Sequence, residues 1–118
     1  MSASHLGLER LVAVVDRNRW QISGQTEECM TLEPLGDRWR AFGWGVVEVD
    51  GHDVEALRDA FEAAPAPGRP SVVIANTTKG RGVRFLEDRK KGHYVKLSAD
   101  LHKRATASLG VPAAVKPR

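Results

Sequence analysis

The chain has little cysteine and no long hydrophobic segment. Its 118 residues include one cysteine, Cys29, which excludes an internal disulfide and makes the cytoplasm the default expected location. The longest apolar run, Leu11–Val15, has five residues, whereas a membrane-spanning helix needs about 20. The N-terminus lacks the basic region and apolar core of a signal peptide. We therefore expect no membrane partner, and we expect Cys29 to be an ordinary, at least half-buried thiol.

The chain also lacks a strong excess of one charge. Eighteen Lys and Arg residues face fifteen Asp and Glu residues, for a formal net charge of +3. Because most of the cations alternate with acids along the chain, we expect no nucleic-acid partner. The richest basic stretch, residues 81–96, also carries glycine, and it suits an anion such as a diphosphate or a sugar phosphate at least as well.

Apolar residues make up 42% of the chain, which is ordinary for a globular protein. The length predicts a single α/β domain over residues 1–110, and two prolines favour a flexible tail over residues 111–118. Apolar runs predict strands at residues 11–15, 44–49 and 71–76, and helical spacing predicts helices at 32–42, 54–64 and 100–109. The alternation predicts a partial doubly wound parallel sheet with flanking helices.

Several details of these elements are predicted as well. The first strand is dense in valine without alternation, so we expect it to be covered on both faces. Residues 21–31 and 84–98 are expected to be loops. Gly43 is expected to end a helix in the left-handed conformation, and Asp50 to cap the next helix. The apolar helix stripes are expected to contain Leu35, Trp39 and Phe42, and Leu57, Ala60, Phe61 and Ala64.

No Ser-His-Asp set, catalytic carboxylate pair or zinc-type spacing is readable, but three polar groups stand out. Asn18 follows the first strand, where open α/β sheets bind ligands, and its carboxamide oxygen suits Mg²⁺ or Ca²⁺. The alternative is an ordinary turn residue. Lys79 lies in a Lys-Gly-Arg-Gly loop whose amides and ammonium could hold an anion, or which could simply be a flexible surface loop. His93 could act at a site or be an exposed loop histidine.

Taken together, these segments resemble the later part of the N-terminal, thiamine-diphosphate-binding region of transketolases. The similarity follows the family's order through Leu8–Asn18, Trp39–Trp44, Val49–Asp53, Glu55–Leu57, Thr78–Val83, and Glu87-Asp88 followed by His93. This resemblance implies that Asn18 and the main-chain oxygen of Trp20 bind a divalent metal, Mg²⁺ or Ca²⁺, that grips the diphosphate. It also implies that Ile22 packs near the cofactor rings, that Lys79 meets the diphosphate, and that His93 contacts both the diphosphate and the donor sugar as a catalytic residue.

The chain departs from the family pattern in several places. Arg19 stands where many members have glycine, and Gly92-His93-Tyr94 replaces Trp-His-Gly. The family's Gly-Asp-Gly sequence, whose Asp is the remaining protein ligand of the metal, is absent. The pyrimidine-binding domain and its cofactor-activating glutamate are absent too.

These absences leave three hypotheses. The chain, whose Met1 lies a few residues before the first strand, could be one component of a split transketolase-like enzyme that moves a two-carbon ketol unit between sugar phosphates. Such a split subunit would be inactive without partner chains that supply Gly-Asp-Gly and the pyrimidine domain, and it would belong to a hetero-oligomer. The alternatives are a degenerate, catalytically inactive domain kept for protein–protein association, and a truncation.

Overall fold

A computed structural model describes residues 1–110, so the expected tail at 111–118 lies outside the described residues. The elements are α1 (Ser2–His5), β1 (Val12–Arg17), α2 (Thr26–Cys29), α3 (Leu35–Ala41), β2 (Gly45–Asp50), α4 (Val54–Ala63), β3 (Ser71–Asn76), the 3₁₀ turn η1 (Lys90–Gly92) and α5 (Ala99–Ser108). They form two compact units. The first unit contains residues 1–18 and 30–77, and the second contains residues 19–29 and the chain from residue 78 onward. The prediction of one domain over residues 1–110 stays a prediction.

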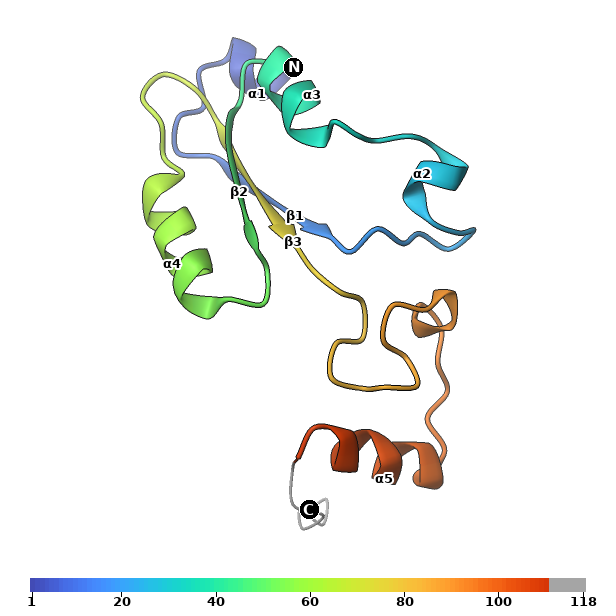
Figure 1. The fold of residues 1–118 in the computed structure, drawn as a ribbon. Coiled ribbons are helices and arrows are strands. Elements are labelled where there is room, and N and C mark those ends of the chain that lie inside the picture. The colour runs from blue at the N-terminus through green and yellow to red at the C-terminus, as the bar shows by residue number, and fades with distance from the viewer. Residues whose placement is uncertain (111–118) are drawn as a thin grey trace. The chain divides into compact units, whose positions relative to one another are not determined.

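The first unit is built on a three-stranded parallel sheet in the order β1-β3-β2 (Figure 1). Val73 at the centre of β3 pairs with Val14 of β1 on one side and with Val47 of β2 on the other. Residues 71–75 are all buried, because β3 has a strand on each side and helices over both faces. The predicted α/β class, with a partial parallel sheet and flanking helices, is confirmed.

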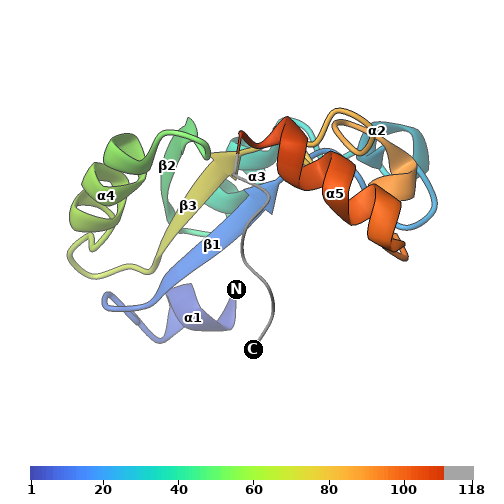
Figure 2. The same cartoon turned by 90° about the horizontal axis from the view of Figure 1, so that it is seen from below.

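Helices cover the two faces of this sheet separately, as Figure 2 shows. On one face, Ala60 and Ala64 at the end of α4 pack against Val73. On the other face, α1 and α3 cover Val72 and Ile74 with Ala3, Leu35 and Trp39. Trp39 meets Trp44 edge to face, with 4.8 Å between ring centroids. Each face of β3 thus has its own small apolar core.

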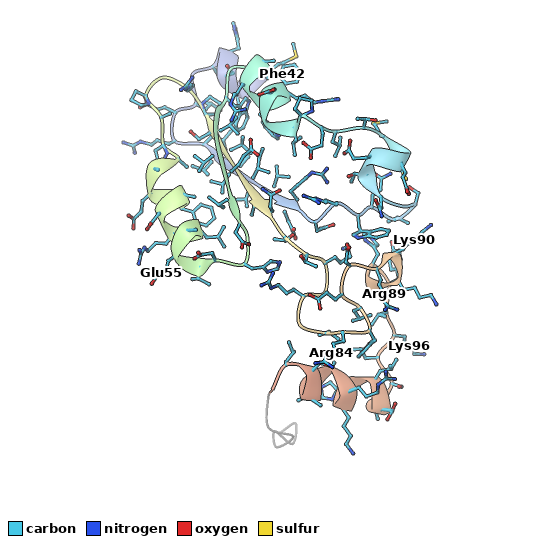
Figure 3. The ribbon with its side chains drawn as sticks, in the orientation of Figure 1. Phe42, Glu55, Arg84, Arg89, Lys90 and Lys96 are labelled. Carbon is cyan, nitrogen blue, oxygen red and sulfur yellow. The ribbon has the colours of Figure 1, made fainter. Side chains whose placement is uncertain are left out.

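The expectation that the first strand is covered on both faces is wrong. Val14 is 55% exposed, because β1 is an edge strand of the described sheet and α4 packs against β2 and β3 instead. Phe42 was also expected in an apolar stripe, but it is 52% exposed. Since α3 ends at Ala41, Phe42 is the C-cap residue, and Figure 3 labels it at the end of this helix. Phe61 of α4 is exposed as well.

Individual residues fix where α3 ends and where α4 begins. Gly43 has φ of +80° after α3, as expected for a left-handed helix end. The N-cap of α4 is Asp53, whose side chain accepts the Ala56 amide at 3.0 Å, and not Asp50 as the sequence suggested. Asp50 instead accepts the His52 amide at 2.9 Å and stabilises the preceding turn.

The second unit is mostly loop with two α-helices. α2 is a single turn inside the stretch that was expected to be a loop. Only Thr26 of its residues is buried, so Cys29 is exposed, in contrast to the expected half-buried thiol. Ser98 caps α5 by accepting the Leu101 amide at 3.3 Å. Within residues 1–110, none of the helices has the length and apolar character needed to span a membrane.

Candidate functional site

The carboxyl end of β1 is tied to the residue that follows β3. The Asp16 carboxylate accepts a hydrogen bond from the Thr77 hydroxyl, and the Thr77 amide donates to the Arg17 carbonyl at 3.3 Å. Asn18 comes directly after this tie and is half-buried. The position is the one at which parallel α/β sheets place ligand-binding residues, so the strand ends fix the backbone from which Asn18 projects.

An ion pair between the buried Arg17 and the exposed Glu33 also holds this strand end. Arg17 is 5% exposed, and its Nε and Nη2 atoms donate to Glu33 Oε1 at 3.0 and 2.7 Å. Glu33 Oε2 accepts the Leu35 amide at 2.9 Å, at the start of α3. The sequence analysis did not single out this pair, because nothing in the order of residues shows that Arg17 is buried.

Trp20 and Ile22 lie in a tight loop of the second unit. The Gln21 amide donates to the Gly24 carbonyl, and the Thr26 amide donates to the Arg19 carbonyl, both at 2.9 Å. Arg19 itself has φ of +66°, a left-handed conformation that glycine adopts without strain. Trp20 is half-buried and Ile22 is exposed. An exposed isoleucine in a closed loop is suited to contact an apolar group from outside.

Lys79 begins a loop that folds back closely on itself. Gly80 has φ of +70°, and a Cβ added there would lie 3.0 Å from the Leu86 carbonyl oxygen. A Cβ at Gly92 would lie 3.4 Å from the Lys79 side chain. The glycines therefore allow residues 79–92 to pack against one another, with Lys79 half-buried among them. His93, just past η1, is exposed and stacks edge to face on Tyr94 at 4.8 Å.

Two side-chain hydrogen bonds join these loops within the second unit. Trp20 Nε1 donates to Asp88 Oδ1 at 2.7 Å, and Lys90 Nζ donates to the Ser23 carbonyl at 2.5 Å. The Asp88 amide in turn donates to the Lys79 carbonyl at 2.8 Å. Figure 3 labels Lys90 on η1. The structure thus links Trp20 to Lys79 through Asp88, while Asn18 belongs to the first unit.

Sequence reasoning assigned no role to Asp88 or Lys90. Glu87-Asp88 entered only as part of a family-like order, and Lys90 only as one cation of a basic stretch. Both act through contacts with residues more than sixty positions away. No local pattern could have revealed these contacts.

The candidate residues carry donor atoms of the kinds that a metal-bound diphosphate requires. The Asn18 carboxamide and the Trp20 carbonyl offer neutral oxygens of the kind that Mg²⁺ and Ca²⁺ prefer. The Lys79 ammonium and the His93 ring offer hydrogen-bond donors to an anion. Within residues 1–110, no group of three or more His, Cys, Asp or Glu side chains could hold a metal. Two protein oxygens alone fall short of the near-octahedral shell of Mg²⁺, so these residues could hold such an ion only as part of a larger ligand set.

Known proteins are similar to nearly the whole of this chain. The family model described as the thiamine diphosphate binding domain of transketolase matches residues 1–116. The 6-deoxy-6-sulfo-D-fructose transketolase subunit of Clostridium sp. (strain MSTE9) is 44% identical over 110 residues, 92% of this chain and 40% of that protein. An apulose-4-phosphate transketolase subunit of Phocaeicola vulgatus is 42% identical over 106 residues, 89% of this chain and 38% of that protein. The chain therefore spans about two-fifths of the length of these relatives.

Solved structures of similar proteins also superpose on this chain. Transketolase from Campylobacter jejuni superposes with a TM-score of 0.83 at 29% identity, over 93% of this chain and 17% of that one. Transketolase from Pichia stipitis in complex with sedoheptulose-7-phosphate superposes with a TM-score of 0.83 at 32% identity, over 93% of this chain and 16% of that one.

Proposed function

The chain belongs to the transketolase family, through its thiamine diphosphate binding domain, and from this premise we propose that it supplies part of the diphosphate and metal site of a split transketolase. The reaction would be transfer of a two-carbon ketol unit from a ketose to an aldose. The observation that carries the proposal is the likeness of nearly the whole chain to two proteins whose names call them transketolase subunits.

Each candidate residue takes a role that its chemistry supports. Asn18 and the main-chain oxygen of Trp20 are the protein's two ligands to Mg²⁺, both hard oxygen donors. Lys79 places a positive charge against the diphosphate, and Ile22 offers an exposed apolar side chain to the cofactor rings. His93, exposed and able to donate a hydrogen bond, contacts the diphosphate and the donor sugar. When bound, thiamine diphosphate supplies the carbanion chemistry of ketol transfer.

The rest of the active site would come from partner chains in a hetero-oligomer. These partners would supply the Gly-Asp-Gly segment, whose aspartate is the missing metal ligand, and the pyrimidine-binding domain. The substrates would be sugar phosphates or similar anionic sugars. The relatives' names mention 6-deoxy-6-sulfo-D-fructose and apulose-4-phosphate, both of which are sugars with an anionic group.

The test compares cofactor binding by the chain alone with binding by the chain plus partners. The full chain is purified alone and together with co-expressed neighbouring gene products, and thiamine diphosphate with Mg²⁺ is titrated by calorimetry. We expect no micromolar binding by the chain alone, and both micromolar binding and ketol transfer by the complex. Micromolar binding or ketol transfer by the isolated chain would refute the split site.

Two variants make this test specific. Asn18→Ala in the complex should weaken binding of Mg²⁺ with thiamine diphosphate by about tenfold or more, because one of two protein ligands is lost. Glu62→Ala is the control, since Glu62 is an exposed residue near the end of α4, and it should leave the affinity unchanged.

The association-only alternative has its own support in the exposed edge strand β1. It predicts that a stable complex forms and that no partner restores cofactor binding. The same calorimetric titration therefore separates the two functions.

A further inference from the structure

Asp88 joins the Trp20 loop to the Lys79 loop, and none of the roles above explains this junction. Its side-chain oxygen accepts the Trp20 indole N–H at 2.7 Å, and its backbone N–H donates to the Lys79 carbonyl at 2.8 Å. One residue thus contacts both a proposed metal ligand and the proposed diphosphate-binding lysine. All three belong to the second unit.

The backbone on both sides of this junction is strained. Two non-glycine residues have positive φ within residues 1–110, Arg19 at +66° and Asp88 at +50°. They lie at the two ends of the same hydrogen bond, since Arg19 directly precedes Trp20. A left-handed conformation is unfavourable for a non-glycine residue because its Cβ crowds the backbone, and such strain concentrates at functional sites. Two such residues at one junction indicate that its geometry is specifically maintained.

The hydrogen bond between Trp20 and Asp88 is short. A carboxylate that accepts from an N–H makes a shorter and stronger bond than a neutral pair does, and 2.7 Å is short for an N–H···O contact. Lys90 adds a second link by donating to the Ser23 carbonyl of the Trp20 loop. The loop at residues 19–29 is therefore fixed to the loop at residues 78–92 at two points.

We propose that Asp88 is a positioning residue that holds Trp20 and Lys79 in one fixed arrangement, so that the Trp20 carbonyl and the Lys79 ammonium are set in advance for a metal-bound diphosphate. Asp88 does not touch the metal or the cofactor in this role. It orients the residues that do, as partners of metal ligands commonly do. The inference rests on the proposed function for its ligand, but the junction itself can be tested without any ligand.

The first experiment uses nuclear magnetic resonance with ¹⁵N labelling on the full chain carrying Val14→Lys, a charge on the exposed edge strand that limits self-association. In this parent chain, the Trp20 indole N–H should exchange slowly with solvent. Asp88→Ala should speed this exchange and shift the amide signals of Ile22 and Lys79. Asp88→Asn keeps an acceptor oxygen and should restore slow exchange. Asp100→Ala removes an exposed aspartate from the same unit and should change none of these signals.

The second experiment measures Mn²⁺ affinity in the presence of thiamine diphosphate, by electron paramagnetic resonance of the complex with partners. Asp88→Ala and Trp20→Phe should each weaken Mn²⁺ binding about tenfold, which is the usual loss when the support of a metal ligand is removed. The double variant should be no worse than either single one, since both remove the same bond. Asp88→Asn should stay within about threefold of wild type, and Asp100→Ala should match wild type.

The outcomes separate this inference from the proposed function. Unchanged Trp20 and Lys79 signals in Asp88→Ala would overturn the inference regardless of the cofactor. Changed signals with unchanged Mn²⁺ affinity would overturn it too, because the junction would then be structural only. If the wild-type complex binds neither Mn²⁺ nor cofactor, the proposed function fails, and the magnetic resonance result alone decides whether Asp88 couples Trp20 to Lys79.

Discussion

Arg17 makes an ion pair at the carboxyl end of β1. Its guanidinium is almost fully buried and pairs with Glu33, directly before Asn18. A buried cation needs a partner because its charge is no longer stabilised by water. The pair therefore fixes both the end of β1 and the start of α3, through the Glu33 bond to the Leu35 amide.

Removing Glu33 should destabilise the first unit measurably. We expect Glu33→Ala to lower the free energy of unfolding by about 1–3 kcal/mol, because Arg17 stays buried without this carboxylate. The matched control is Asp37→Ala, which breaks the mostly exposed ion pair with Arg40 and should cost about 0–0.5 kcal/mol. Urea unfolding followed by tryptophan fluorescence measures both. Equal effects would show that burial of Arg17 does not matter.

The helices of the first unit depend on a few residues at their ends. α4 begins at its Asp53 cap and covers one face of β3 with Ala60 and Ala64. The sequence placed this helix within one residue, because the acidic turn and the apolar spacing both marked it. It missed the capping residue, because Asp50 and Asp53 are both plausible caps until the backbone is known.

The hydrogen bond at the N-cap of α4 should contribute measurably to stability. Asp53→Ala should lower the free energy of unfolding by about 1 kcal/mol, since the Ala56 amide loses its acceptor. Asp53→Asn keeps that acceptor and should stay within about 0.3 kcal/mol of the wild type. Thermal unfolding followed by circular dichroism distinguishes the two variants. An equally large loss for Asp53→Asn would point to charge rather than to the hydrogen bond.

At the scale of the chain, the described residues form a sheet of three strands with β1 at one edge. In the part of the chain that the structure describes, β1 has no strand on its outer side, and Val14 is exposed on it. An open edge with an exposed apolar side chain favours association with another chain. The chain also spans only about two-fifths of its relatives' length.

We therefore expect the isolated chain to self-associate. Sedimentation velocity should show oligomers or aggregates that grow with protein concentration. Val14→Lys should reduce this association, because a charged side chain on an edge strand opposes pairing. Val54→Lys, which changes an exposed valine on α4, should not. A monodisperse wild-type monomer with a sharp thermal transition would contradict the expectation.

The sequence by itself determined the three strands, the longer helices and the candidate residues. Apolar runs and spacing identified β1, β2, β3 and α4, because burial of those side chains is what forms them. Asn18, Lys79 and His93 could be singled out because their side chains carry the chemistry and because they follow a family order.

Only the tertiary structure decided which residues support them. Arg17–Glu33 and Trp20–Asp88 join positions far apart in the chain, and the exposure of Val14 depends on which strand lies in the middle of the sheet. The physical reason is that burial and long-range hydrogen bonds belong to the packed chain, whereas the sequence shows only neighbours and spacing.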